Sequence, residues 1–196
     1  MVAKRSSRSQ DILQALARML ENSRGSRITT AALAAELGVS EAALYRHFPS
    51  KTRMYEGLIE FIEETIFARV TTITKDEPDA VSQCYRIISL CLTFAEKNAG
   101  ISRLLHGDAL TGETERLHHR IAQLFSRLES QLKQILREAE ISRGLRVNPS
   151  VSVATDIMIV ILEGKISQFV RSEFKQSPTQ HWSEQWALLE NQLFNQ

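Results

Sequence analysis

The chain has 196 residues, of which 43% are hydrophobic and 24% charged, with only eight glycines and four prolines. This length is sufficient for a packed core, and the composition excludes collagen-like, low-complexity and largely disordered chains. The formal net charge of +1 gives no support for a nucleic-acid partner.

The distribution of charge is more informative than its total. Residues 1–53 hold nine basic and four acidic side chains, whereas residues 54–196 hold 15 basic and 19 acidic ones. A basic segment joined to a mildly acidic body is a hint of nucleic-acid contact. We therefore predict an N-terminal domain over residues 1–53 and a C-terminal domain over residues 54–196.

Three features indicate a cytoplasmic protein. Met1–Gln10 is polar and basic and has no apolar centre, so it does not resemble a secretory signal. The most apolar run, Ile157–Leu162, is too short to span a bilayer, so no stable membrane insertion is expected. Cys84 and Cys91 lie about 10 Å apart along a predicted helix, too far for a disulfide. Without nearby His or Cys ligands they predict buried apolar filler rather than a metal site.

Apolar residues recur at three- and four-residue spacing throughout the chain, and the prolines fall between these segments. The pattern predicts an all-α fold of about nine helices, with no strand. In chain order, the helices are expected over about 9–22, 29–37, 40–48, 51–74, 79–98, a short segment after 100, 113–142, 150–174 and 182–194.

The eighth and ninth predicted helices carry more apolar surface than one neighbour would cover. Ile157–Leu162 is apolar almost all round, which implies burial on several sides. Trp182, Trp186, Leu189 and Leu193 follow in amphipathic order. The pattern favours a dimer interface, and packing within one chain is the alternative.

The segment from Ile28 to Phe48 predicts a helix-turn-helix. Two short helices meet at Gly38, a residue suited to a left-handed turn. The apolar residues that set the angle between the helices are expected to be Leu33, Leu37, Val39 and Leu44, with the small Ala34 at the crossing. An ordinary helical hairpin with solvated charges is the alternative.

The second helix of this pair is expected to enter the major groove of DNA. Small residues at its front allow close approach, and the polar residues that follow supply hydrogen bonds to phosphates and base edges. The predicted contacts are Ser40, Glu41, Ala42, Tyr45, Arg46 and His47.

Two further groups are predicted to contact the DNA backbone. Lys51 and Thr52 begin the fourth helix, and Thr29 and Thr30 begin the second, where backbone N–H groups favour an anion. The threonines are equally suited to capping their helices. A basic arm that could reach a neighbouring groove contains Lys4, Arg5 and Arg8, although an ordinary solvated tail fits as well.

These residues resemble the DNA-binding domain of the TetR family. The resemblance rests on Ile28-Thr29-Thr30, Leu33-Ala34, Gly38-Val39-Ser40, Leu44-Tyr45-Arg46-His47-Phe48 and Ser50-Lys51. It implies an N-terminal helix-turn-helix, a C-terminal dimerisation body, a homodimer formed through helices eight and nine, and palindromic double-stranded DNA as the partner.

A narrower resemblance is to the nucleoid occlusion factors, TetR-like proteins that inhibit cell division. It rests on Ser40–Glu64 and Arg171–Lys175 and extends through nearly the whole chain. It implies association with the nucleoid and binding of the division protein FtsZ across helices four and five. The matching positions are Phe61, Arg69, Leu90, Lys97 and Asn98.

Two residues depart from the pattern of these factors. Thr93 stands where glycine is usual, and Lys97 replaces an arginine and loses its bidentate fork. Core contacts between helices four and five are the alternative reading of Phe61 and Leu90.

Two other functions fit the sequence less well. A conventional TetR-type repressor would enclose a small-molecule ligand, but its candidate lining residues form no convincing constellation: Cys84, Cys91, Phe94, His106 and His118. An enzyme would need a catalytic cluster, and neither His118-His119 near Glu115 nor His106 with Asp108 has suitable spacing. We therefore expect no enzyme activity, no metal, no cofactor and no small-molecule ligand.

Overall fold

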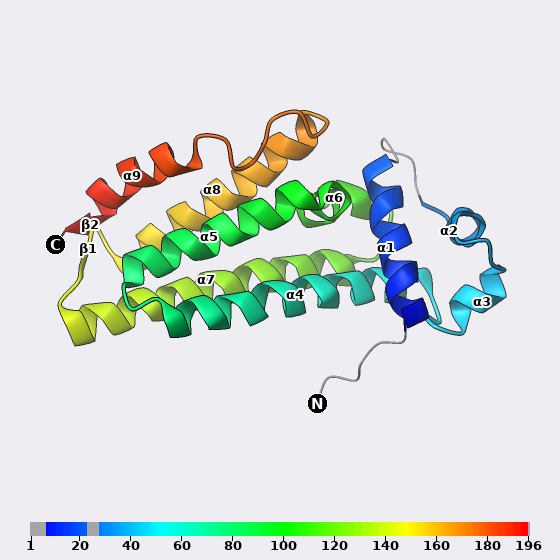
Figure 1. Cartoon of the computed structure of the whole chain (residues 1–196), viewed down its shortest axis with the longest axis horizontal. Helices are drawn as coiled ribbons and strands as arrows, with labels where there is room; N and C mark the ends of the chain where they lie inside the picture. Colours follow the sequence, from blue (N-terminus) through cyan, green and yellow to red (C-terminus); the bar gives the residue numbers. More distant parts are fainter. Residues whose placement is uncertain (1–6, 23–27, 196) are drawn as a thin grey trace. The chain divides into compact units, whose positions relative to one another are not determined.

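The computed structural model describes residues 7–22 and 28–195 and confirms the predicted all-α architecture (Figure 1). The helices of this described part are α1 (Ser7–Asn22), α2 (Thr30–Glu36), α3 (Glu41–Tyr45), α4 (Lys51–Asp76), α5 (Ala80–Lys97), α6 (Ala99–His106), α7 (Glu115–Arg143), α8 (Val151–Arg171) and α9 (Trp182–Leu193), with a single 3-10 turn over Asp108–Leu110. Two strands of two residues each, β1 (Arg146–Val147) and β2 (Phe194–Asn195), pair antiparallel. The sequence did not predict them because two residues are too few to show alternation.

The chain packs as two compact units. The first contains the described residues up to Ile62 together with Asn98–Ile121, and the second contains 63–97 with the described residues from Ala122 onward. The division predicted between residues 53 and 54 falls inside α4, which is continuous from Lys51 to Asp76. That boundary stays a prediction.

The core of the first unit is built around α1 and α6. Ile12 and Leu16 of α1 and Leu104 of α6 are fully buried. Gly100 permits this close packing, because a Cβ at its position would lie 2.0 Å from the carbonyl oxygen of Ala17.

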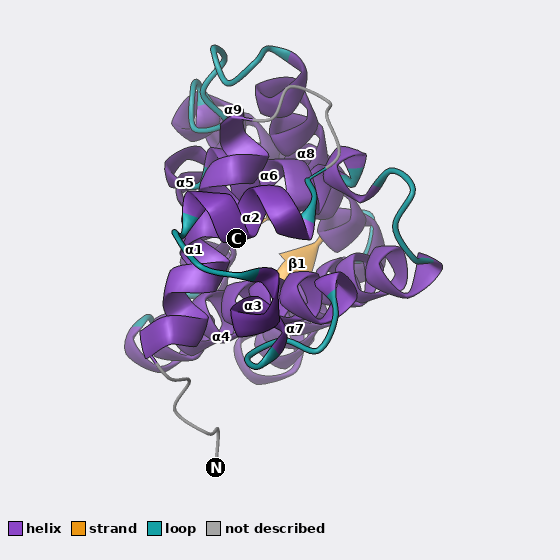
Figure 2. Cartoon of the chain, turned by 90° about the vertical axis from the view of Figure 1, so that its right-hand side faces the viewer, coloured by secondary structure: helices purple, strands orange, loops and turns teal. Residues whose placement is uncertain are grey.

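A buried arginine links α6 to the end of α1. The Arg103 guanidinium donates a hydrogen bond to the Leu20 carbonyl at 2.9 Å and another to Asp108 Oδ2 at 2.8 Å. It thereby satisfies one of the carbonyls that a helix leaves unpaired at its C-terminus. Figure 2 shows α1 with α2 and α3.

In the second unit, α5 packs against α8 and α9. Trp182 Nε1 donates a 2.7 Å hydrogen bond to Ser89 Oγ, and its ring stacks on Tyr85. Cys84 and Cys91 are buried as free thiols, as predicted. Burial raises the pKa of Cys91 to about 12 and raises that of Cys84 still further, so both thiols stay protonated.

The apolar run on α8 is only partly covered within one chain. Ile159 and Leu162 are buried, but Val160 is 60% exposed and Val153 is also exposed. On α9, Leu188 is 70% exposed. These two helices therefore present apolar side chains that the described residues of a single chain leave in water.

Candidate nucleic-acid interface

The turn between α2 and α3 forms as its sequence predicts. Gly38 has a φ of 64°, in the left-handed region that glycine adopts without a steric penalty. Thr29 Oγ1 accepts a hydrogen bond from the Ala32 amide at 3.1 Å and so caps α2. Ser40 Oγ accepts one from the Ala43 amide at 3.3 Å and caps α3.

Apolar side chains fix the angle between these two short helices. Leu33 and Ala34 of α2 and Leu44 of α3 are buried, while Leu37 and Val39 are half-buried. The five residues that were predicted to set the crossing therefore include three in the core of the first unit.

The helix α3 is shorter than predicted. It ends at Tyr45 rather than near Phe48, because the His47 amide donates to the Leu44 carbonyl at 2.9 Å, a bond to the third residue back that tightens the turn. Pro49 also disfavours a helical conformation at the residue before it. Arg46 and His47 consequently leave from the turn that follows α3, and both are exposed.

Three of the predicted DNA contacts are joined by hydrogen bonds. The Tyr45 hydroxyl donates to Thr30 Oγ1 at 3.2 Å, and Thr30 Oγ1 donates to Glu41 Oε2 at 2.5 Å. Tyr45 is 42% exposed, so this chain of polar groups lies at the surface. It connects the start of α2 with the outward side of α3. The spacing of these residues in the sequence did not predict it.

The remaining predicted contacts of the helix-turn-helix also reach solvent. Ala42 is exposed at the front of α3.

Of the basic arm, Lys4 and Arg5 lie outside the described residues. Arg8 lies in α1, where its exposed guanidinium is 3.7 Å from Asp11.

The start of α4 is held by ionic contacts that sequence reasoning missed. Ser50 Oγ caps the helix by accepting from the Arg53 amide at 3.2 Å, as predicted. Lys51 Nζ lies 2.5 Å from Glu113 Oε1 and 5.6 Å from the centre of the Tyr55 ring. Thr52 is half-buried. Glu113 precedes α7 by two residues and is 62 positions away from Lys51, so no local pattern connects them.

A second carboxylate, that of Glu56, is buried one turn further along α4. Arg53 Nη1 lies 2.7 Å from its Oε2, and Arg116 Nε of α7 lies 2.7 Å from its Oε1. Both arginines are largely exposed while Glu56 is not. The charge of this buried carboxylate is therefore compensated from two elements.

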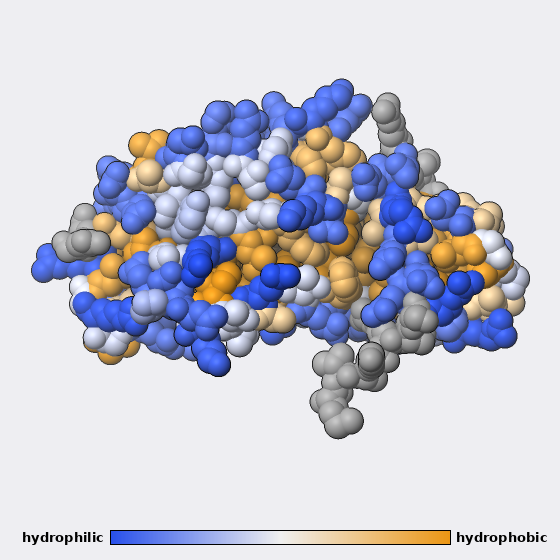
Figure 3. Space-filling model, viewed as in Figure 1, coloured by the Kyte–Doolittle hydropathy of each residue, from blue (hydrophilic) through white to orange (hydrophobic). Residues whose placement is uncertain are grey.

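The predicted partner positions on α4, on α5 and directly after α5 differ in exposure. Phe61 is 42% exposed, so its alternative reading as a core residue is wrong. Arg69 and Lys97 are exposed, and Leu90 and Asn98 are half-buried. Figure 3 shows patches of apolar side chains among hydrophilic ones in the part of the view where α4, α5 and α7 run.

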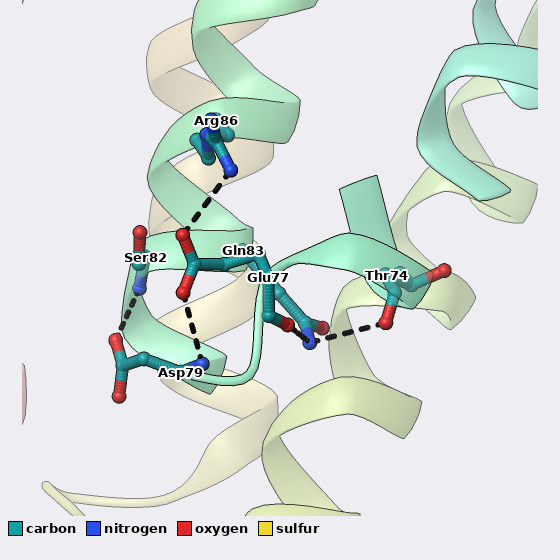
Figure 4. A network of polar contacts seen from close by, with 6 residues as sticks. All are labelled: Thr74, Glu77, Asp79, Ser82, Gln83 and Arg86. Carbon is teal, nitrogen blue, oxygen red and sulfur yellow. Dashed lines mark hydrogen bonds and ion pairs between the residues drawn. The ribbon is translucent and has the colours of Figure 1, made fainter. Parts of the chain in front are cut away.

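The turn between α4 and α5 is tied by a polar network (Figure 4). Gln83 Nε2 donates to the Glu77 carbonyl at 2.6 Å, and the Glu77 carboxylate accepts from the Asp79 amide at 3.1 Å and from Arg86 at 3.2 Å. The hydrogen bond that the Asp79 amide donates to the Glu77 carboxylate, together with the positive charge of Arg86, helps to lower the pKa of Glu77. Asp79 caps α5 through the Ser82 amide.

The described residues contain no cluster of three or more His, Cys, Asp or Glu side chains that could bind a metal. A small cavity of about 100 Å³ in the second unit is lined by residues that include Ala80, Gln83 and Ile135. None of the five predicted ligand-lining residues is among those around it. None of the described helices combines the length and apolarity needed to cross a membrane.

Both the N-terminal and the C-terminal part of the chain match known protein families. Residues 12–58 match the family of bacterial regulatory proteins called tetR, and residues 78–194 match the tetracyclin repressor-like C-terminal domain of SlmA-like proteins. The nucleoid occlusion factor SlmA of Shewanella halifaxensis is 56% identical over 95% of this chain and 94% of its own length. That of Shewanella oneidensis is 55% identical over 98% of both chains. The chain belongs to the SlmA family of TetR-like proteins.

Solved structures of TetR-family regulators share the fold of this SlmA-family chain at low sequence identity. The regulator FadR from Bacillus subtilis, in complex with stearoyl-CoA, has a TM-score of 0.78 at 16% identity and covers 92% of this chain and 96% of its own. KstR2 from Mycobacterium tuberculosis has a TM-score of 0.75 at 16% identity over 98% of both chains. These similarities show the fold alone, and the SlmA family is one of regulatory proteins rather than of enzymes.

Proposed function

We propose that this chain is a sequence-specific DNA-binding nucleoid occlusion factor that inhibits cell division by antagonising FtsZ assembly over the chromosome. The observation that carries this proposal is the 56% identity to a nucleoid occlusion factor over 95% of the chain. A helix-turn-helix with exposed polar groups on its second helix supports it.

The helix α3 would read the major groove. Ala42 at its front leaves room for the groove wall, and Tyr45, Arg46 and His47 carry hydrogen-bond donors. Thr29, Thr30, Ser40 and Glu41 lie at the starts of α2 and α3, where contacts to phosphates and base edges begin. The hydrogen bonds among Thr30, Glu41 and Tyr45 hold three of these side chains before DNA arrives.

A homodimer through α8 and α9 would present two copies of α3 to one palindromic site. The exposed Val153, Val160 and Leu188 supply the apolar area that such an interface buries. Half-sites one helical turn apart require recognition helices about 34 Å apart.

FtsZ would be bound by the face of α4 and α5. Phe61 offers an exposed aromatic ring, and Arg69 and Lys97 offer exposed cations. In the second unit, Arg69 and Lys97 with the half-buried Leu90 suit a short segment that is both acidic and apolar. Phe61 and Asn98 of the first unit are proposed as further contacts. The polar network around Glu77 and Gln83 supports this face by fixing the turn between its two helices.

DNA reading is tested by titrating Arg46→Ala against a palindromic site at several salt concentrations. We expect weaker binding and, if Arg46 contacts one phosphate, a salt slope reduced by about 0.9. Arg137→Ala removes an exposed arginine of α7 and serves as the matched control. If both substitutions change DNA binding and its salt slope equally, Arg46 does not contact the DNA.

Division control is tested with an FtsZ co-sedimentation and polymer assay in the presence and absence of the palindromic DNA. Arg69→Asp is expected to abolish the effect on FtsZ while DNA binding survives. Arg137→Asp makes the same charge change on an exposed residue of α7 and is expected to leave FtsZ binding intact. Loss of both DNA and FtsZ binding in Arg69→Asp would indicate misfolding and contradict a separate partner face.

The alternative of a ligand-released repressor is not favoured. The relatives that match nearly the full chain at 55–56% identity are nucleoid occlusion factors. The stearoyl-CoA of FadR belongs to a protein that shares only 16% of this sequence.

A further inference from the structure

Lys51 occupies the first position of α4, yet its ammonium is not simply directed into solvent. It lies 2.5 Å from Glu113 Oε1, and the two side chains are 18% and 6% exposed. The Tyr55 ring lies 5.6 Å from the same nitrogen. The positive charge is therefore largely compensated by a buried carboxylate before any other anion approaches.

A DNA phosphate at the start of α4 would meet this ion pair. The helix N-terminus attracts the phosphate through its free backbone N–H groups and its dipole. The phosphate and the Glu113 carboxylate would compete for the Lys51 ammonium. A close contact between Lys51 and the phosphate therefore requires the ion pair of Lys51 with Glu113 to weaken. Glu113 would then be left as a buried carboxylate with one compensating charge withdrawn, which is unfavourable.

We propose that Glu113 is a positioning residue for DNA binding that competes with the DNA backbone for Lys51. Binding of a phosphate draws Lys51 away from Glu113 and loosens the segment in which Glu113 stands, residues 111–117. The inference rests on the proposed DNA-binding function and adds to it a coupling between the start of α4 and the start of α7. Both residues belong to the first compact unit.

The segment that responds to DNA is defined by its own hydrogen bonds. The Glu113 amide donates to the Leu110 carbonyl at 2.9 Å, and the Leu117 amide donates to the Thr114 carbonyl at 3.0 Å. These two bonds bracket the start of α7 and report whether the segment opens. Because coupling is reciprocal, whatever strengthens the pair of Lys51 and Glu113 lowers DNA affinity by the same factor by which DNA weakens the pair.

The first test compares Glu113→Gln with Glu115→Gln in binding to a palindromic DNA duplex. Both substitutions remove one negative charge, but Glu115 is exposed and has no contact with Lys51 among the described ion pairs. We expect Glu113→Gln to tighten binding several-fold and to steepen the salt slope by up to about 0.9, as one more phosphate is neutralised. Glu115→Gln is expected to change the DNA affinity and the salt slope far less. In a double variant, Lys51→Gln is expected to cancel the gain in DNA affinity that Glu113→Gln produces.

Equal effects of the two glutamine variants would overturn the proposal, as would weaker binding by a folded Glu113→Gln. The outcome differs from failure of the proposed function, because that failure would appear as no specific binding of the duplex by the unaltered protein.

A second measurement needs no change at Glu113. Amide hydrogen exchange at residues 113–117 is compared in the full chain with and without the duplex, and again in Lys51→Gln. We expect DNA to speed exchange at the Glu113 and Leu117 amides of the unaltered protein and to leave that of Lys51→Gln unchanged. Exchange that is slowed or unchanged by bound DNA in the unaltered protein would overturn the competition.

Discussion

Substitution of Gly100 by alanine tests how tightly α6 packs on α1. The new Cβ would lie 2.0 Å from the Ala17 carbonyl oxygen and 2.9 Å from the Glu21 amide nitrogen. The first distance is about 1.5 Å shorter than the roughly 3.5 Å at which nonbonded heavy atoms attract each other best. Both obstructing atoms belong to the backbone of α1, so no side-chain rotation relieves the overlap.

The expected cost follows from two opposing effects. Alanine favours a helix over glycine by about 1 kcal/mol. Overpacking a core typically costs about 1–3 kcal/mol, and more where the neighbour cannot move. We expect the second effect to prevail and the free energy of unfolding to fall by about 2 kcal/mol. For a chain of this length that corresponds to a drop of about 4–8 °C in the unfolding midpoint.

Thermal and urea unfolding at a fixed protein concentration measure this loss, with Gly57→Ala as a graded control. Its Cβ would lie 2.8 Å from the Phe48 ring, a side-chain atom that can shift. We expect Gly57→Ala to be clearly less destabilising. An unchanged or raised midpoint for Gly100→Ala would refute the close approach of α6 to α1.

Two further predictions concern the second unit. A thiol reagent at pH 8 should label both Cys84 and Cys91 in denaturant and neither of them in the folded protein. Burial raises the pKa of each thiol, that of Cys91 to about 12, and so keeps the thiols unreactive. Rapid labelling without denaturant would contradict their burial. The sign of this shift also predicts a stability contribution that is present below the thiol pKa of the unfolded chain and falls as the pH rises above about 9. Val160→Glu places a charge on the exposed apolar side of α8 and should convert the proposed dimer to monomer in analytical ultracentrifugation, whereas Glu190→Gln on α9 should not; a dimer of undiminished affinity in Val160→Glu would place the interface elsewhere.

The local structure of the helix-turn-helix was predictable because its determinants lie a few residues apart. Gly38 adopts the left-handed turn, and Ser40 and Ser50 cap the helices that follow them. The burial of Cys84 and Cys91 was predictable for a similar reason, since two thiols without further ligands in an apolar helix have no favourable alternative to the core. Periodicity and capping act within one or two helical turns.

The tertiary structure decided which partners the functional side chains have. Lys51 suits a phosphate by its position, but only the folded chain brings Glu113 to its ammonium. Helical spacing allows Phe61 to be either core or surface, and packing leaves it 42% exposed. Ion pairs and exposure depend on residues that are distant in sequence, and a single chain's periodicity carries no information about their approach. The sequence by itself thus determined an all-α chain with a helix-turn-helix, and the tertiary structure determined how the start of α4 is held before DNA binds.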